Sequence, residues 1–292
     1  MSRNVVRKFA PRAAFVATSA ASFVDRLVLQ SMTQANDPRW NTERVVPANS
    51  ISVIVPALNE ESVLASTLES IRACHPLEVI LVDGGSIDGT QKVASSYGAK
   101  ILFSAPGRAE QMNCGAAAAS GSVLLFLHAD TRLPPQFDHL VWEALARPGV
   151  VAGAFELRID APARSLRWIE RLANWRSRRL HLPYGDQAIF VRAELFHSIG
   201  GFPELPIMED FELMRRLRRS GRIEVVREPV RTSARRWVEA GILRTTLANQ
   251  LAIVAYLMGT EPARIACWYH RYRKHGSLNG SSSEARAETP SL

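Results

Sequence analysis

The sequence predicts an α/β protein with a mostly parallel central sheet and helices on both faces. From Ser50 onwards, short runs of β-branched and leucine residues alternate with stretches whose apolar residues recur at helical spacing. Short connections join these runs, as in strand–helix–strand units. The 292 residues and the hydrophobic share of 47% suit one large α/β domain with appendages, or two small domains.

The first half of the chain has the more regular alternation. The β-branched run Ile51–Val55 ends before Pro56, which is typical of a buried strand. The apolar residues of Glu61–Cys74 then fall on one helical face, which predicts an amphipathic helix. The strands expected next are Leu77–Val82, Ala99–Phe103 and Ser122–Leu127, and the helices between them are Gln91–Tyr97 and Arg108–Ala119.

After Pro148 the alternation is less regular. The expected strands are Val150–Arg158, Ala188–Val191 and Ile223–Val226 with its continuation to Arg231, and the expected helices are Ala163–Arg179, Asp210–Arg219 and Gly241–Gly259. We expect amphipathic helices over 238–275 and a disordered Ser/Gly-rich tail over 276–292. No run reaches the roughly 18 apolar residues of a membrane span.

Residues 1–49 differ from the rest of the chain. A basic start precedes an Ala/Ser/Phe/Val stretch that has no clear cleavage site and no continuous apolar segment. We expect a poorly ordered N-terminal extension here, with a weak targeting segment, a signal-like peptide or a misassigned start as the alternatives.

Charge and cysteine content limit the partners and the compartment. The net charge of +8 predicts anionic partners such as phosphates, nucleic acid or an acidic membrane, although arginine-rich codon usage explains it equally well. Only the charge favours nucleic acid, because no recognition motif accompanies it. The three cysteines lack disulfide or zinc spacing, so we expect a cytoplasmic protein.

Polar residues follow the predicted strands at the edge where open α/β sheets place their sites. Asp83 and two glycines come directly after the second strand, where a carboxylate suits the N–H of a base such as uracil. The alternative is a turn in which Asp83 and Asp88 cap the next helix. His128 and Asp130 end the fourth strand, and one aspartate with a ligand diphosphate can hold Mg²⁺ or Mn²⁺. A polar strand end without metal is an equal alternative for that pair.

Two later motifs are weak by themselves. Glu209 and Asp210 open a helix, where the helix dipole favours acids whatever their function. The loop before them, Gly200–Ile207, is rich in glycine and proline and can present a carboxylate to a cleft. The segment Thr232–Trp237 pairs Arg235 with Arg236, which suits phosphate oxygens.

In this order and spacing, the motifs resemble those of the family 2 glycosyltransferases, which are inverting enzymes with the GT-A (nucleotide-diphospho-sugar transferase) fold. Val55–Glu60 resembles the opening strand and loop of that family, and Val82–Thr90 resembles V-D-D-G-S-x-D-G-T. Residues 108–115, RAEQMNCG, resemble A-R-N-x-G, and His128–Asp130 lies where the family has D-x-D. Met208–Asp210 matches E-D, so the resemblance covers about 50–237, which we expect to be the catalytic domain.

The resemblance implies a nucleotide-diphosphate sugar donor, in the first place a UDP-sugar, and a divalent metal, Mg²⁺ or Mn²⁺. It implies Asp210 as the general base assisted by Glu209, and Asp130 as the metal ligand. The implied substrate-binding residues are Pro56, Ala57, Glu60, Asp83, Arg108, His128, Asp186, Gln187, Arg236 and Trp237.

Several positions depart from the family pattern. Gly84 replaces the second Asp of the base-binding motif, and Ser233 replaces Gln in Q-x-x-R-W, which counts against a processive polysaccharide synthase. His128, Tyr184–Arg192 and Ser233–Trp237 are most similar to a bacterial subgroup of radical-SAM/selenodomain-associated (arsenosugar-type) transferases, and a carotenoid glycosyltransferase is a related interpretation. The alternatives from other classes are a nucleotidyltransferase on a related fold and a non-catalytic sugar-nucleotide-binding protein.

The acceptor is expected to be a small molecule or a lipid. The arginine-rich helix Ala163–Arg179 carries Trp168, Leu172 and Trp175 at helical spacing, which predicts peripheral contact with an anionic membrane. A helix packed on the sheet with a solvated arginine face is an equal alternative.

Overall fold

The structure is a computed structural model that describes residues 49–74, 76–235, 241–269 and 271–272. All of them belong to Val46–Leu292, the larger of two units into which contacts divide the chain. The predicted extension and tail lie outside the described residues, apart from Asn49, and so do Arg236 and Trp237. The predicted domain boundaries therefore stay predictions.

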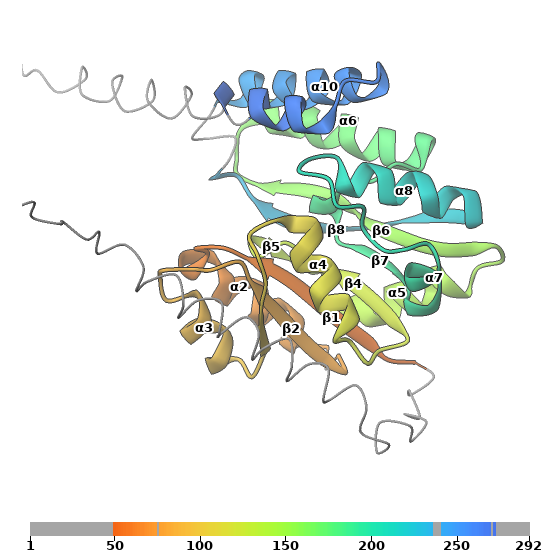
Figure 1. The fold of residues 1–292 in the computed structure, drawn as a ribbon. Coiled ribbons are helices and arrows are strands. Elements are labelled where there is room, and N and C mark those ends of the chain that lie inside the picture. The colour runs from red at the N-terminus through yellow and green to blue at the C-terminus, as the bar shows by residue number, and fades with distance from the viewer. Residues whose placement is uncertain (1–48, 75, 236–240, 270, 273–292) are drawn as a thin grey trace, which may run out of the picture. The chain divides into compact units, whose positions relative to one another are not determined.

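Eight described strands form one sheet in the order β3-β2-β1-β4-β7-β6-β8-β5 (Figure 1). They are β1 (Ile51–Ala57), β2 (Glu78–Asp83), β3 (Lys100–Phe103), β4 (Val123–Phe126), β5 (Thr131–Arg132), β6 (Val150–Asp160), β7 (Ile189–Arg192) and β8 (Arg222–Ser233). Within this described sheet, four of the seven pairings are parallel: β1 with β2, β1 with β4, β2 with β3, and β6 with β8. The predicted α/β sheet is confirmed, and its antiparallel pairings all involve β7 or β5.

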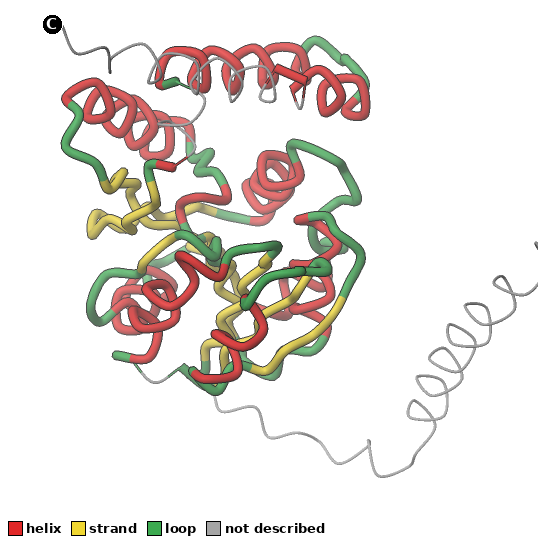
Figure 2. Tube along the Cα trace, turned by 90° about the vertical axis from the view of Figure 1, so that its left-hand side faces the viewer, coloured by secondary structure: helices red, strands yellow, loops and turns green. Residues whose placement is uncertain are grey.

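Helices cover both faces of the sheet. The described helices are α2 (Glu61–Arg72), α3 (Thr90–Ser96), α4 (Arg108–Ala117), α5 (Phe137–Ala146), α6 (Arg164–Leu180), α7 (Ala193–Ser198), α8 (Glu209–Ser220) and α10 (Ile242–Leu257), with a 3-10 turn η2 (Gly185–Gln187). Alternate residues of a strand face opposite sides, so Val53 joins the core under α2, α3, α5 and α6, whereas Ile54 joins the core under α4, α7 and α8. Figure 2 shows the strands between these helices.

The structure corrects several predicted elements. Helix α5 was not predicted, although Phe137, Val141 and Leu145 recur at helical spacing and are buried. Helix α7 has six residues, too few to show a period in the sequence. Strand β8 continues two residues past the predicted end, because Thr232 pairs with Thr131 and Ser233 pairs with Asp160.

The reversed strand β7 brings a further segment to the edge where the site lies. Strands β1, β2 and β4 are parallel, so their carboxyl ends meet at one edge. Because β7 runs antiparallel to β4, its amino end lies at that same edge, and η2 immediately precedes it. Strands β6 and β8 are parallel to each other and β6 is antiparallel to β7, so the end of β8 arrives there too.

Candidate active site

A pocket of about 520 Å³ lies at this edge of the sheet. Five parts of the chain form it: the start of α4, the end of β4, η2, the loop into α8, and α10 with Tyr269. The lining residues are Pro106, Gly107, Arg108, His128, Tyr184, Asp186, Leu205, Pro206, Ile207, Met208, Glu209, Asp210, Asn249, Ala252, Ile253 and Tyr269. Of the residues predicted for the site, the pocket therefore unites Arg108, His128, Asp186, Glu209 and Asp210.

Asp210 is held by the backbone. Its Oδ2 accepts a 2.7 Å hydrogen bond from the Gly185 N–H, and its Oδ1 accepts one of 2.7 Å from the Phe211 N–H. Two such bonds fix the orientation of the carboxylate. The side chain is therefore a positioned acceptor at the start of α8, as a general base must be.

His128 and Asp210 both lie close to Gly185, where a side chain would crowd them. A Cβ atom at this position would lie 3.1 Å from His128 Nε2 and 3.3 Å from Asp210 Oδ2. The imidazole nitrogen and the carboxylate oxygen therefore both border the Gly185 backbone, although 81 residues lie between them in the chain. This shared neighbour places His128 near the candidate base.

We expect Gly185→Ala to lower turnover about tenfold, because the added methyl displaces His128 or Asp210 by a few tenths of an ångström. The free energy of unfolding should change by less than about 1 kcal/mol. Turnover and urea denaturation check both quantities. Gly149→Ala is the control, since its backbone is left-handed (φ 74°) with no atom near the new Cβ; it should cost about 1 kcal/mol of stability and leave turnover unchanged. Equal turnover in both variants would show that the absence of a side chain at Gly185 does not matter for catalysis.

Glu209 is a buried acid beside another acid. Its exposed fraction is 6%, and its carboxylate lies 4.0 Å from the Arg108 guanidinium. Burial, followed by the Asp210 charge, raises the pKa of Glu209 to about 7, while Arg108 opposes the shift. A buried acid with a raised pKa in a pocket is typical of acid–base sites.

We expect Glu209 to destabilise the fold as the pH rises. Its pKa is higher in the folded chain than the ordinary value of 4.5, so the folded state binds the proton more tightly between about pH 4.5 and 7, and stability falls through that window. Glu209→Gln should flatten this dependence and gain on the order of 2 kcal/mol relative to the native chain between pH 5 and 8. Urea denaturation across that range measures it. Glu194→Gln, at an exposed acid of α7, should keep the native pH dependence.

Two left-handed residues hold the pocket segments. Met208 (φ 70°) precedes Glu209, and Ala188 (φ 50°) follows η2. Non-glycine residues adopt this conformation at a cost, and such strain concentrates at functional sites. The backbone thus turns sharply at the two points that present Asp210 and Gly185.

The predicted base-binding residue, Asp83, is completely buried at the end of β2. Its Oδ1 accepts hydrogen bonds from the Ser86 N–H (3.0 Å) and hydroxyl (2.5 Å), and its Oδ2 accepts one of 2.6 Å from the Gln91 amide. Asp83 therefore closes a turn, as the alternative holds, but it does not cap α3, and it does not line the pocket. Its role in base binding stays a prediction.

Sequence reasoning missed Gln111, which explains the departure at Gly84. The Gln111 amide donates bonds of 2.8 Å to both Ala57 O and Val82 O and so links the ends of β1 and β2. A Cβ at Gly84 would lie 3.1 Å from this amide, which leaves little room for the family's second Asp. Gln111 lies in the motif RAEQMNCG, so its place in that motif could have marked it as a site residue.

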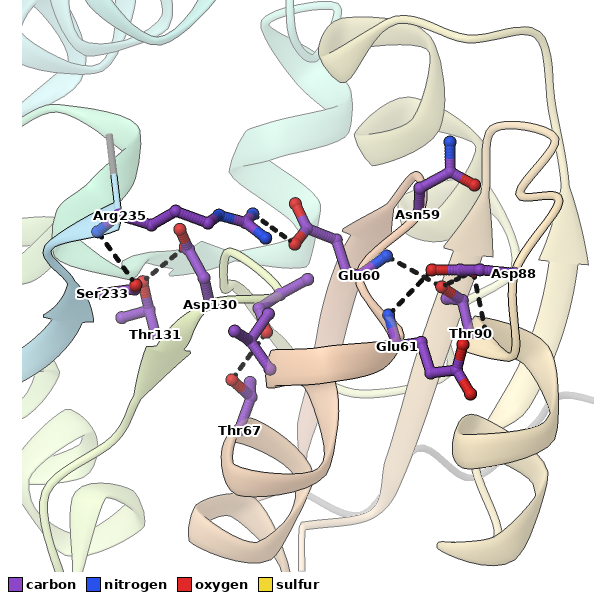
Figure 3. A network of polar contacts seen from close by, with 12 residues as sticks. Asn59, Glu60, Glu61, Thr67, Asp88, Thr90, Asp130, Thr131, Ser233 and Arg235 are labelled. Atoms are coloured by element: carbon purple, nitrogen blue, oxygen red, sulfur yellow. Dashed lines mark hydrogen bonds and ion pairs between the residues drawn. The ribbon is translucent and has the colours of Figure 1, made fainter. Parts of the chain in front are cut away.

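A polar network joins Glu60, Asp130 and the end of β8 (Figure 3). Arg235 forms a 2.6 Å ion pair with Glu60, and Figure 3 shows its side chain passing Asp130. Asp130 is 7% exposed, and the backbone N–H of Ser233 bonds its carbonyl at 3.0 Å. The network therefore joins the predicted donor residue Glu60 to the end of β8, the same strand end to which Asp130 is bonded.

Gln187 does not reach the pocket. It is completely buried, its amide N–H donates to Phe155 O at 2.8 Å, and its Oε1 accepts from the Ser177 hydroxyl at 2.7 Å. These bonds fix η2 to β6 and α6, and η2 contains Gly185 and Asp186. Pro56 and Ala57 are also outside the pocket lining, at the end of β1.

The far wall of the pocket was not predicted. Asn249, Ala252 and Ile253 come from α10, and Tyr269 follows it. These residues lie beyond the region of family resemblance and carry no motif, so only the packing of α10 reveals them.

The fold and the pocket define an α/β protein whose ligand site, with paired acids, lies beyond the carboxyl ends of parallel strands. A family model, "Glycosyl transferase family 2", matches residues 52–200, about half of the 292-residue chain. The chain belongs to glycosyl transferase family 2, a family of transferase enzymes, and the predicted family is confirmed.

Relatives named for glycosyl transfer support this membership. The chain is 33% identical over 175 residues to a PGL/p-HBAD biosynthesis glycosyltransferase of Mycobacterium bovis (strain BCG / Pasteur 1173P2), covering 53% of this chain and 64% of that protein. It is 31% identical over 151 residues to glucosyl-3-phosphoglycerate synthase of Mycolicibacterium smegmatis (strain ATCC 700084 / mc(2)155), covering 41% and 49%. The chain thus spans less than two thirds of these relatives.

The fold resembles that of a solved glucosyl-3-phosphoglycerate synthase from Mycobacterium tuberculosis in complex with Mn²⁺, uridine diphosphate and glucosyl-3-phosphoglycerate. The TM-score is 0.51 and the identity 23%, over 70% of this chain and 80% of that one. This similarity, together with the family match, confirms the predicted GT-A fold.

Proposed function

We propose that the protein transfers a sugar from a nucleotide-diphosphate sugar, with UDP as the nucleotide, to an acceptor hydroxyl with inversion at the anomeric carbon. The observation that carries this proposal is the pocket in which backbone N–H groups hold Asp210 beside His128. Family membership supports glycosyl transfer over the nucleotidyltransferase alternative.

Asp210 is the proposed base. As the acceptor oxygen bonds to the anomeric carbon, Asp210 takes its proton, and the bond from that carbon to the diphosphate oxygen breaks with its electron pair leaving on the diphosphate. Such proton transfer typically contributes about 10²–10⁴-fold. Arg108 lines the same pocket and supplies positive charge where the diphosphate departs. Glu209 assists because its own charge, which changes near neutral pH, alters the electrostatic potential at Asp210.

Asp130 is the proposed ligand of Mg²⁺ or Mn²⁺. Within the described part of the chain, no three His, Cys, Asp or Glu side chains gather as a complete metal site. One buried carboxylate, with an imidazole two residues earlier, fits an ion whose other ligands are donor phosphate oxygens and water. Bound there, the ion would neutralise charge on the leaving diphosphate. The Mn²⁺ and uridine diphosphate named with the solved glucosyl-3-phosphoglycerate synthase support this assignment.

The nucleotide is proposed to lie over the ends of β1 and β2, against Pro56, Ala57 and Glu60. Asp83 is completely buried, so a base has to displace a neighbouring group to reach it, and the Gln91 amide, the donor to Oδ2, is the candidate. Asp186 faces the same pocket as Asp210 and is proposed to bind the transferred sugar. Arg236 and Trp237 keep their predicted roles in donor binding.

The finer assignments are proposals that rest on the sequence. We propose the bacterial radical-SAM/selenodomain-associated subgroup only on the sequence patterns at His128, Tyr184–Arg192 and Ser233–Trp237. A cytoplasmic location is supported by three widely spaced cysteines, which are free thiols in the structure. Among the described residues, no helix is long and apolar enough to cross a bilayer.

A thermal-shift panel of UDP-, GDP- and TDP-sugars with Mg²⁺ or Mn²⁺, combined with nucleotide release, tests the proposal. We expect a UDP-sugar to raise the Tm only when a metal is present, and to be cleaved slowly to UDP. Stabilisation without any cleavage or transfer would identify a non-catalytic binding protein instead. The absence of both effects with every donor would reject the proposal.

A further inference from the structure

Helix α10 has two opposite apolar faces. Asn249, Ala252 and Ile253 line the pocket. The residues on the other side form what we call the apolar strip, and their exposed fractions are 54% for Leu247, 45% for Leu251, 51% for Val254 and 80% for Met258. At 3.6 residues per turn the two sets lie about half a turn apart. The strip therefore faces away from the pocket.

Large apolar side chains are costly to leave in water. Burial of one leucine or valine is worth about 1.5–3 kcal/mol, and a continuous exposed row, unlike a scattered residue, marks an interaction surface. The strip recurs at i, i+4, i+7 and i+11, so its members form one row along the helix. Within the described part of the chain, no other segment covers this row.

Helix α6 supplies a second exposed row and a strong positive charge. It packs beside α10 (Figures 1 and 2) and exposes Trp168, Leu172 and Trp175 by 70%, 55% and 52%. Six arginines lie in α6, and α10 has no acid. The one acid of α6, Glu170, is buried and bonded by the Ile159 N–H and by Arg167. Arg178 pairs with Glu156, whereas Arg164, Arg171 and Arg179 are exposed and form no ion pair with a described residue. Apolar rows beside such arginines complement an anionic lipid surface.

The pocket is lined by both polar and apolar groups. Asp210, His128 and Arg108 contribute polar groups, and the 205–207 loop and α10 contribute apolar ones. A ligand suited to this lining has a hydroxyl for Asp210 and an apolar body against Ala252 and Ile253. Helix α10 thus separates the apolar lining from the strip.

We propose that the acceptor is an amphiphilic alcohol taken from an anionic lipid surface, on which α10 and α6 rest while its hydroxyl reaches Asp210. The proposal deepens the proposed function and rests on it. Shallow contact by two helices agrees with the lack of a spanning helix among the described residues.

Acceptor chain length tests the pocket. With a metal and a UDP-sugar, kcat/KM for n-alkyl alcohols from butanol to decanol should rise about fourfold for each added methylene until the apolar lining is covered. Ile253→Asn should flatten this slope while the Tm shift caused by UDP and metal stays native. Equal kcat/KM for butanol and decanol would overturn the inference but leave the proposed function intact. No transfer and no donor cleavage would reject the proposed function itself.

Vesicle sedimentation of the full chain tests the surface. We expect binding to phosphatidylcholine vesicles that contain about 30% phosphatidylglycerol, and at least tenfold weaker binding to pure phosphatidylcholine or in Leu247→Gln/Leu251→Gln. Leu77→Gln is the matched control, because Leu77 is also 45% exposed but precedes β2. Native binding by the double variant, or equal binding to both vesicle types, would overturn the inference. A dimer in solution that the double variant abolishes would instead assign the strip to a second copy of the chain.

Discussion

Asp210→Asn should reduce sugar transfer by about 10²–10⁴-fold and leave donor binding within a few-fold of the native value. The amide cannot take a proton from the acceptor hydroxyl, whereas the position of the side chain is largely kept. The amide oxygen can still accept one of the bonds now made by the Gly185 and Phe211 N–H groups. Steady-state kinetics and calorimetric titration with UDP and metal measure the two quantities.

The control for this variant is Glu212→Gln, two residues further along α8. Glu212 forms ion pairs with Arg215 and Arg216 and is not a lining residue of the pocket. It should therefore keep near-native turnover, with a stability change below about 1 kcal/mol. Native turnover in Asp210→Asn would refute its assignment as the base. A collapse of donor binding in that variant would show that Asp210 acts on the donor.

Asp130→Asn should abolish the metal dependence of donor binding and lower turnover at least about 100-fold. An amide is a much weaker ligand for a hard cation than a carboxylate, so the ion and the diphosphate no longer hold each other in place. Differential scanning fluorimetry with UDP, with and without Mn²⁺, measures the loss directly. Native protein should gain stability only when both are present.

Asp160→Asn is the matched control for the second variant. Asp160 is the last residue of β6 and pairs with Arg132 at the surface, on a strand next to β8. The Asp160→Asn variant should retain the rise in Tm that UDP causes only when Mn²⁺ is present. A native Tm shift in Asp130→Asn would show that Asp130 is not the metal ligand. The alternative, a polar strand end without metal, would then hold.

The sequence determined the sheet and the order of the motifs. Strands β1, β2 and β4 are buried runs of β-branched and leucine residues, and such runs fold as strands because both faces are covered. The carboxyl-end rule then placed His128 and Asp130 at the functional edge. Glu209 and Asp210 were found by their motif, since acids in a first helical turn are common.

Only the tertiary structure decided which of these residues meet. The reversal at β7 carries Gly185 to the edge where β4 ends, and the missing side chain there brings His128 close to Asp210. No local pattern contains that proximity, because it depends on how the 81 intervening residues pack. The burial of Gln187 likewise arises from bonds to α6 and β6.

The same division holds for α10. Its composition predicted a helix, but Arg244, Thr245, Asn249 and Gln250 are scattered around its axis, so no single polar face shows which side is covered. Packing assigns Ala252 and Ile253 to the pocket and leaves Leu247 and Leu251 in solvent. Local residue chemistry therefore determined the helices, the strands and the candidate acids. Contacts between distant segments determined the pocket, the raised pKa of Glu209 and the exposed apolar strip.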